Sequence, residues 1–260
     1  MIHHFDHRWA TYDNGDSRDA TLSEKADCNF QPTARYWVPE REMANRLAAK
    51  GWIGGWLIGW RDIARSTDER TVIFAVMPRA AVGHTCPLIF VDAEPKRLAA
   101  LLANLDSLAL DFVARLKLGG THLTYGYLKQ LPLIQPASYT QNDLAFIVPR
   151  VLELSYTSHS IASFARDLGY DGPPFAWSED RRAQLRAELD AWYARAYGLT
   201  RDELRYILDP ADVMGADYPS ETFRVLKTNE IRRFGEYRTA RLVLAAWDRL
   251  TGGSDANVKT

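Results

Sequence analysis

The sequence predicts an α+β fold, in which a mixed region of strands and helices is followed by a helical region. Two observations support this prediction. Runs rich in β-branched and aromatic residues have the length and composition of strands, and they lie at residues 52–60, 71–77 and 88–91. Helix-capping signals then dominate the second half of the chain. We therefore expect two domains, residues 1–136 and residues 137–260.

Two helices are expected in the first domain besides the strands. One begins at Pro39, because proline suits a first helical turn, and it ends before Gly51. A longer helix begins near Pro95 and carries leucines at helical spacing. The glycine pair 119–120 should end it. The glycines inside the 52–60 strand indicate that another backbone approaches closely there.

The second domain should consist of helices alone. Ser178 is a favourable N-cap, and Thr200 with Glu203 forms a capping-box pattern. Helices are expected within residues 141–169, from Ser178 to Gly198, from Thr200 to Asp209, from Ser220 to Gly235 and over residues 236–250. This region is therefore expected to be an all-helical domain.

Bulk composition excludes several classes of protein. Net charge is -1, so a nucleic-acid surface requires local segregation of charge. Two cysteines, Cys28 and Cys86, cannot form a disulfide framework or a four-cysteine zinc site. The N-terminus lacks the basic and apolar regions of a signal peptide, and the apolar stretch at 51–60 is too short to span a bilayer. We expect a cytoplasmic protein without a membrane partner.

Basic residues are separated from acidic ones in two windows, 70–91 and 112–142, which contain no Asp or Glu. Phosphate contacts require cations kept clear of carboxylates, so both windows are candidate DNA contacts. The alternative is that they are core or loop segments with few charges of either sign. In a third window, 221–241, bases outnumber acids, but a solvated face with ion pairs is the favoured interpretation because this window is helical.

The loop at residues 118–127 has the composition of a contact loop. Its glycines let a backbone approach a ligand closely. Its threonines, tyrosines and His122 supply donors and acceptors suited to phosphates and base edges. The alternative is a helix end that runs into a turn with His122 in the core.

Several segments, in this order, resemble the specificity region of type IIG-like N6-adenine DNA methylases. Residues 59–73, with T-D-E-R-T at 67–71, are similar to an arginine-rich turn followed by a strand start. Residues 101–108 resemble the L-L-N-S-L helix of that region. Residues 117–123 follow, and then 128–133, which resemble the end of its target-recognition domain. Residues 185–193, 197–204 and 234–239 are similar to its helical tail.

The resemblance implies that the parent protein is a site-specific adenine methyltransferase of a restriction–modification or phage-defence system. Such enzymes carry an upstream catalytic domain that binds S-adenosylmethionine and holds the flipped adenine with an Asn/Asp-Pro-Pro-aromatic motif. The nearest match, residues 171–175, has Gly172 where the amide or carboxylate is needed. We expect no cofactor in this chain, and we interpret it as a truncation, a split gene or a separate specificity subunit.

The predicted function is sequence-specific recognition of double-stranded DNA, in partnership with a methyltransferase catalytic domain or subunit. The alternative is a protein-interaction or structural domain of a phage-defence complex. No residue is assigned to catalysis, cofactor binding or metal binding, and whether the chain itself has enzymatic activity stays open. The predicted DNA-contacting residues are Arg61, Arg65, Thr67, Arg70, Arg115, Lys117, Thr121, His122, Tyr125 and Lys129.

Overall fold

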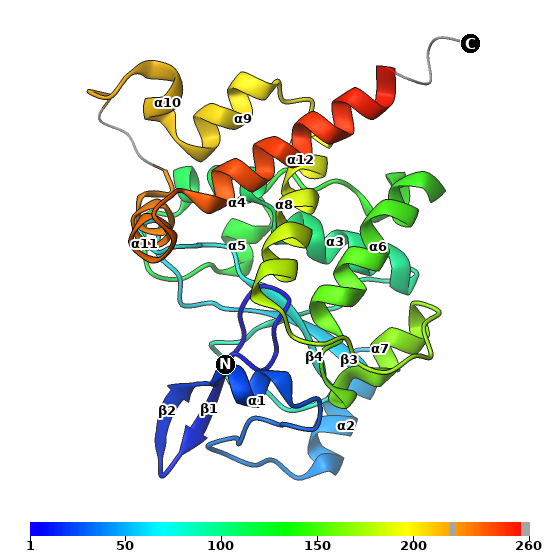
Figure 1. Ribbon diagram of the computed structural model, residues 1–260. Helices are drawn as coiled ribbons and strands as arrows, with labels where there is room; N and C mark the ends of the chain where they lie inside the picture. The colour runs from blue at the N-terminus through cyan, green and yellow to red at the C-terminus, as the bar shows by residue number, and fades with distance from the viewer. Residues whose placement is uncertain (219–221, 256–260) are drawn as a thin grey trace. The chain divides into compact units, whose positions relative to one another are not determined.

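The computed structural model describes residues 1–218 and 222–255 and confirms the α+β class (Figure 1). Helices account for 49% of the chain, and strands, in small antiparallel sheets, for 10%. The chain divides into two compact units, each assembled from three segments. Unit 1 comprises residues 1–62, 73–103 and 134–177, and unit 2 comprises residues 63–72, 104–133 and 178–260.

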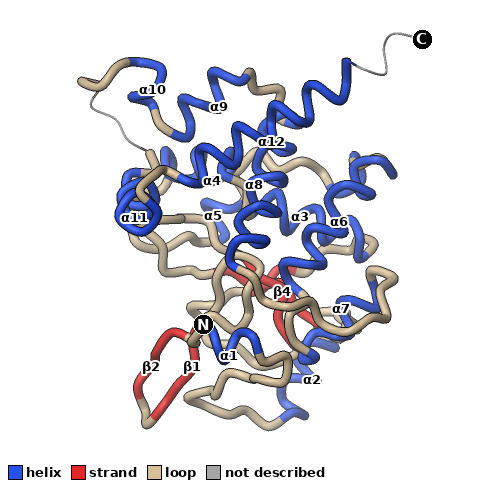
Figure 2. Tube along the Cα trace, in the orientation of Figure 1, coloured by secondary structure: helices blue, strands red, loops and turns tan. Residues whose placement is uncertain are grey.

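Unit 1 combines two small sheets with short helices (Figure 2). Its elements are β1 (Ala10–Asp13), β2 (Asp16–Asp19), α1 (Leu22–Ala26), α2 (Glu40–Ala48), β3 (Trp56–Trp60), β4 (Phe74–Pro78), β5 (Leu88–Ile89), α3 (Pro95–Leu105, ending in unit 2), the 3-10 helices η1 (Pro136–Ser138) and η2 (His159–Ile161), α6 (Gln141–Ser155) and α7 (Ala162–Asp167). The second sheet has the strand order β4-β3-β5, and both pairs are antiparallel.

The three predicted strands all form, but each is shorter than its apolar run. In the central strand β3, Ile58 pairs with Val76 of β4 on one side and with Ile89 of β5 on the other. A buried cluster that includes Ile2, Leu57 and Ala75 packs beneath this sheet. Burial of these apolar side chains, rather than the short ladders, supplies most of the stabilisation.

The hairpin β1–β2 was not predicted, although its turn has a clear local signal. Asn14 and Gly15 link the strands, and both have positive φ, at 50° and 93°. Positive φ at both turn residues matches the right-handed twist of a two-residue hairpin, which is why Asn-Gly favours it. The residues of β1 alternate only over Ala10–Asp13, and β2, with the sequence Asp-Ser-Arg-Asp, has no apolar residue, so the hydrophobic pattern gave little indication of a pair of strands.

Unit 2 is built from helices around an apolar core. Its elements are α4 (Leu108–Lys117), α5 (Tyr125–Leu128), α8 (Glu179–Ala196), α9 (Arg201–Leu208), α10 (Pro210–Met214), α11 (Arg224–Phe234) and α12 (Arg238–Asp255). Helix α12 packs against α8 and α9, and α4 contacts the same two helices. The shared core includes Leu108, Ala191, Leu204, Phe223 and Val243.

The predicted N-caps at Ser178 and Thr200 are confirmed, whereas the last helix begins at Arg238 rather than at residue 236. The Ser178 hydroxyl accepts a hydrogen bond from the Arg181 amide at 3.3 Å, and Thr200 forms its capping box with Glu203. The expected start at Ser220 lies outside the described residues.

The single helix predicted from residue 95 to residue 118 is wrong, because the chain forms two helices, α3 and α4. Ser107 leaves the helical conformation and caps α4, with its hydroxyl accepting from the Leu110 amide at 3.4 Å. The Leu108 amide, another donor without an intrahelical partner, donates to the Asp190 carboxylate at 2.7 Å. Serine is a strong N-cap, so it divides an otherwise continuous apolar pattern.

The expected domain boundary at residue 136 stays a prediction about independently folding parts. The compact units divide the chain differently, since residues 104–133 group with the C-terminal helices. Within unit 1, the Arg97 guanidinium donates to the Pro136 and Tyr139 carbonyls and fixes the segment that follows the expected boundary.

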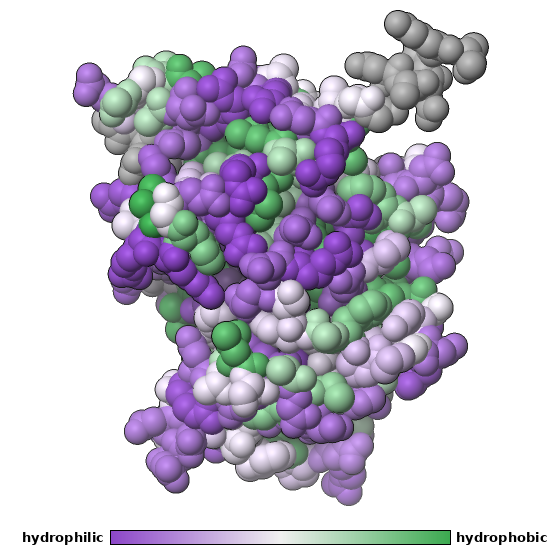
Figure 3. All heavy atoms as spheres, viewed as in Figure 1, coloured by the Kyte–Doolittle hydropathy of each residue, from purple (hydrophilic) through white to green (hydrophobic). Residues whose placement is uncertain are grey.

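The surface seen in Figure 3 is mostly hydrophilic, with hydrophobic residues in small patches between the polar ones. No helix among the described residues combines the length and the apolar character needed to cross a membrane.

Candidate nucleic-acid interface

The two segments predicted to contact DNA lie side by side in unit 2. Ile63 forms an isolated antiparallel bridge with His122, and the Ala64 amide donates to the Thr121 carbonyl at 3.1 Å. These contacts join the turn that begins after residue 64 to the loop at residues 118–127. Residues nearly 60 positions apart therefore contribute to one surface.

The turn that carries Arg65 and Thr67 is closed by its own hydrogen bonds. The Asp68 carboxylate accepts from the Arg65 amide at 2.9 Å, and the Asp68 amide donates to the Arg65 carbonyl at 3.1 Å. The Thr71 hydroxyl donates to the same carbonyl at 2.8 Å. The Asp68 carboxylate thus braces the backbone, while the exposed Arg65 guanidinium forms no ion pair within the described residues.

Arg70 faces the interior of unit 2 and does not present its charge to solvent. Its Nε donates to Asp111 at 2.6 Å, and its Nη2 donates to the Asp106 carbonyl at 2.6 Å. Burial lowers the pKa of the Arg70 guanidinium, but the nearby carboxylates, Asp111 above all, outweigh burial and raise it overall. Arg70 therefore belongs to a structural network, and we remove it from the contact surface.

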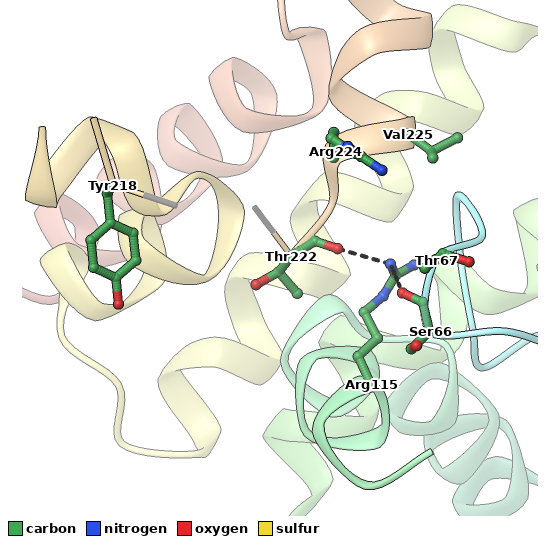
Figure 4. Close-up of a pocket in the computed structure, with 7 residues that line it drawn as sticks. All are labelled: Ser66, Thr67, Arg115, Tyr218, Thr222, Arg224 and Val225. Atoms are coloured by element: carbon green, nitrogen blue, oxygen red, sulfur yellow. Dashed lines mark hydrogen bonds between the residues drawn. The ribbon is translucent and has the colours of Figure 1, made fainter. Parts of the chain in front are cut away.

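Arg115 is also buried, and all five of its N–H donors are used. Nε donates to Asp111 at 3.0 Å. Nη1 donates to the Ser66 and Thr222 carbonyls at 2.9 and 2.8 Å, and Nη2 donates to the carbonyls of Asp68 and Glu69 at 2.8 Å each. Figure 4 shows its guanidinium between Ser66 and Thr222. Burial lowers its pKa. With no free donor, Arg115 is also removed from the contact surface.

The remaining predicted residues of unit 2 are exposed. They are Arg65, Thr67, Lys117, Thr121, His122, Tyr125 and Lys129. The loop between them is anchored by Leu118 and Leu123, whose side chains are buried. The exposed position of His122 contradicts the alternative in which this residue lies in the core.

Lys117 and Lys129 flank the loop from two different helical segments. Lys117 ends α4, whereas Lys129 follows the single-turn helix α5, and its amide donates to the Tyr125 carbonyl at 3.0 Å. Neither lysine forms an ion pair within the described residues. No acidic residue occurs between Asp111 and Asp143, so the loop presents two lysines without a neighbouring carboxylate in its own sequence.

Arg61 is not grouped with this surface. It belongs to unit 1, where its half-buried side chain follows β3 and its amide donates to the Ile73 carbonyl at 3.0 Å. We therefore leave Arg61 out of the surface defined by unit 2.

The third basic window, in α11 and α12, agrees with the ion-paired interpretation at three of its positions. Ion pairs join Lys227 to Asp209 at 3.0 Å, Arg238 to Asp180 at 2.9 Å and Arg241 to Glu236 at 2.8 Å. These cations are partly neutralised, which weakens them as phosphate ligands.

Arg224, at the start of α11, was not singled out from the sequence. It is exposed and lines a polar cavity of about 280 Å³ together with Thr67, Arg115 and Thr222 (Figure 4). This cavity adjoins the turn of the candidate surface. No local signal identifies Arg224, because its proximity to Thr67 arises from tertiary packing.

Comparison with known proteins adds no assignment. No family model matches the chain, and no curated protein or solved structure is similar to it at a significant level. The chemistry of the surface must therefore be argued from its residues, which offer cations, hydroxyl groups and an exposed aromatic ring.

Proposed function

We propose that unit 2 binds double-stranded DNA through the turn at 65–67 and the loop and helix ends at 117–129. The observation that carries this proposal is the pairing of Ile63 with His122, which places the two predicted segments together. Lys117, Lys129 and Arg65 would neutralise phosphates, because exposed cations that are not already paired with carboxylates are available to them.

Polar groups between these cations suit the reading of base edges. Thr67, Thr121 and His122 can donate and accept hydrogen bonds, and the exposed Tyr125 adds a phenol group. Phosphate contacts fix the position of a protein on a duplex, whereas contacts with base edges carry sequence information. The surface offers both kinds of group on one connected backbone.

The biological setting that we propose rests on the resemblance described above. It is sequence-specific recognition for an adenine-specific DNA methyltransferase of a cytoplasmic restriction–modification or phage-defence system. A methyltransferase catalytic domain or subunit would be the partner, and S-adenosylmethionine would bind to that partner.

The test is equilibrium binding of the wild-type chain to random-sequence duplexes over a range of salt concentrations. Each phosphate neutralised should contribute a slope of about −0.9 to the logarithm of affinity against the logarithm of salt concentration. We expect steep salt dependence and a slope that decreases by about one for Lys129→Ala. Lys96→Ala, which removes an exposed cation of unit 1, is the matched control. Absence of duplex binding at low salt would overturn the proposal and favour a protein-interaction role.

A further inference from the structure

The segment of unit 1 that leads into α2 exposes two consecutive aromatic rings. Trp37 is 82% exposed and Tyr36 is 76% exposed. The other tryptophans, all in the described part of the chain, are buried or half-buried, so Trp37 is an exception within its own residue type. Exposure of one large ring can be incidental, but exposure of two adjacent rings requires an explanation.

The backbone that carries these rings is held at its ends and unpaired between them. The Tyr12 amide donates to the Thr33 carbonyl at 3.2 Å, and the Thr33 amide donates to the Thr11 hydroxyl at 2.8 Å. Beyond this anchor, residues 34–38 form no backbone hydrogen bond within the described part of the protein. They form a loop that ends where Pro39 caps α2 (Figure 2). The rings are therefore carried by a loop that bends at Arg35 and Tyr36.

The Trp37 ring is open to a ligand, and the Tyr36 ring has a cation over it. No ring contact to Trp37 occurs among the described residues, and Tyr36 is approached by the Arg35 guanidinium at 5.3 Å from its centroid. Arg35 is exposed and has no carboxylate partner in the described residues. A planar group could therefore stack on the indole with a cation close by.

We propose that Tyr36 and Trp37 form a stacking platform for the unpaired bases of single-stranded DNA. Bases in a duplex already stack on each other, so an aromatic side chain covers a base face at least cost where the strand is unpaired. Stacking of this kind tolerates any sequence, because every base has a π face. This binding activity is separate from the duplex binding proposed for unit 2.

The size of the apolar surface favours nucleic acid over a protein partner. Specific protein interfaces bury about 800 Å² on each partner around an apolar core. Between residues 23 and 55, the exposed large apolar side chains are Tyr36, Trp37, Val38 and Ile53. Charged residues follow directly, with Glu40, Arg41 and Glu42 at the start of α2. Two rings suffice for one or two bases but not for such a core.

The charge balance predicts how this site should respond to salt. From residue 28 to residue 39 there is no acidic residue, but the flanking helix contributes acids and bases in nearly equal number. Stacking, rather than neutralisation of phosphates, should therefore supply most of the affinity. We expect shallow salt dependence at this site, in contrast to the steep dependence expected for unit 2.

The test is titration of the whole chain with oligo(dT) while tryptophan fluorescence is recorded. Stacking on Trp37 should quench the emission of the wild-type chain, and Trp37→Phe should remove most of that quenching while binding persists. In parallel, Trp37→Ala should weaken binding of labelled oligo(dT) about tenfold. Val38→Ala, which truncates an exposed neighbour without a ring, should leave binding unchanged.

The outcome separates this proposal from that for unit 2. Lys129→Ala should leave binding of oligo(dT) intact, and Trp37→Ala should leave duplex binding and the melting temperature intact. If oligo(dT) neither quenches the emission nor binds more weakly to Trp37→Ala, the stacking platform is overturned, and a protein contact becomes the remaining explanation for the segment. Failure of duplex binding alone would overturn only the proposal for unit 2.

Discussion

Arg115 donates from Nη2 to the backbone carbonyl of Asp68 at 2.8 Å, and this bond ties the last turn of α4 to the turn that carries Arg65. Four further donors of the same guanidinium reach neighbouring acceptors. A side chain that looks from the sequence like a DNA ligand thus acts within unit 2. It positions the backbone from which the exposed Arg65 projects.

Arg115→Lys should destabilise the protein although it preserves the charge. Lysine has three donors and arginine has five, so at least two of the acceptors lose their donor. We expect the free energy of unfolding to fall by about 2–4 kcal/mol, since each buried group without a partner costs about 1–3 kcal/mol. Urea denaturation measures this change. Lys117→Ala, in the same helical turn but exposed, is the control, and a similar small loss in both variants would contradict the positioning role.

Asp190 should make stability depend on pH. Burial raises the pKa of this carboxyl from 3.8 to about 6, against the opposing influence of Arg70 and the Leu108 amide. The folded state then binds more protons than the unfolded state between these values. Stability is penalised above pH 6, and the penalty disappears as the pH falls towards 4. The full change should amount to about 3 kcal/mol.

The measurement is the difference in unfolding free energy between the wild-type protein and Asp190→Asn, followed from pH 4 to pH 7. Asparagine keeps an acceptor for the Leu108 amide but does not titrate. The difference should favour the wild type more at pH 4 than at pH 7. Asp190→Ala should lower stability at pH 4, because the Leu108 amide loses its acceptor, while showing the same pH-dependent difference. If the difference in unfolding free energy does not change with pH, burial does not raise the pKa of the Asp190 carboxyl.

The sequence predicts local features of this protein better than contacts between distant segments. The fold class and the caps at Ser178 and Thr200 follow from short patterns, and the structure confirms them. The bridge between Ile63 and His122 joins distant segments, so no local pattern could reveal it. The sequence predicts the turn near Arg65 and the loop at residues 118–127 as separate candidate contacts, but it does not predict that they lie together.

The burial of Arg70 and Arg115, which argues against their predicted role as DNA contacts, has a specific cause. The acid-free window 112–142 begins directly after Asp111, whose carboxylate binds both guanidinium groups. Asp111 and Arg115 are four residues apart on one helix, a spacing that favours an ion pair. That signal was available in the sequence. The partnership of Asp111 with Arg70 was not, because it depends on tertiary structure.

Gly120 should matter for binding but not for folding. A Cβ added at this position meets no atom within 4 Å, and the backbone does not adopt positive φ. Gly120→Ala should therefore change the free energy of unfolding by less than about 0.5 kcal/mol. If the loop backbone lies against DNA, the added methyl group should weaken duplex binding several-fold in an anisotropy assay.

Gly59→Ala provides the contrasting case. Its Cβ would lie 2.9 Å from the sulfur of Met77 and 3.1 Å from that of Cys86, so overpacking should cost about 1–3 kcal/mol of stability. If Gly120→Ala binds duplexes as well as the wild-type chain does, the loop backbone does not approach DNA closely, and only its side chains remain as contacts.

The double variant Arg65→Ala/Lys117→Ala separates phosphate binding from bracing of the turn. The brace runs from the Asp68 carboxylate to the Arg65 backbone amide, which alanine retains. Both side chains are exposed and form no ion pair within the described residues. The melting temperature should therefore stay unchanged, while the salt slope for duplex binding falls by about two. A lower melting temperature with an unchanged slope would mean that these side chains support the fold. If neither quantity changes, neither residue touches DNA, and the proposed surface would have to lie elsewhere on the protein.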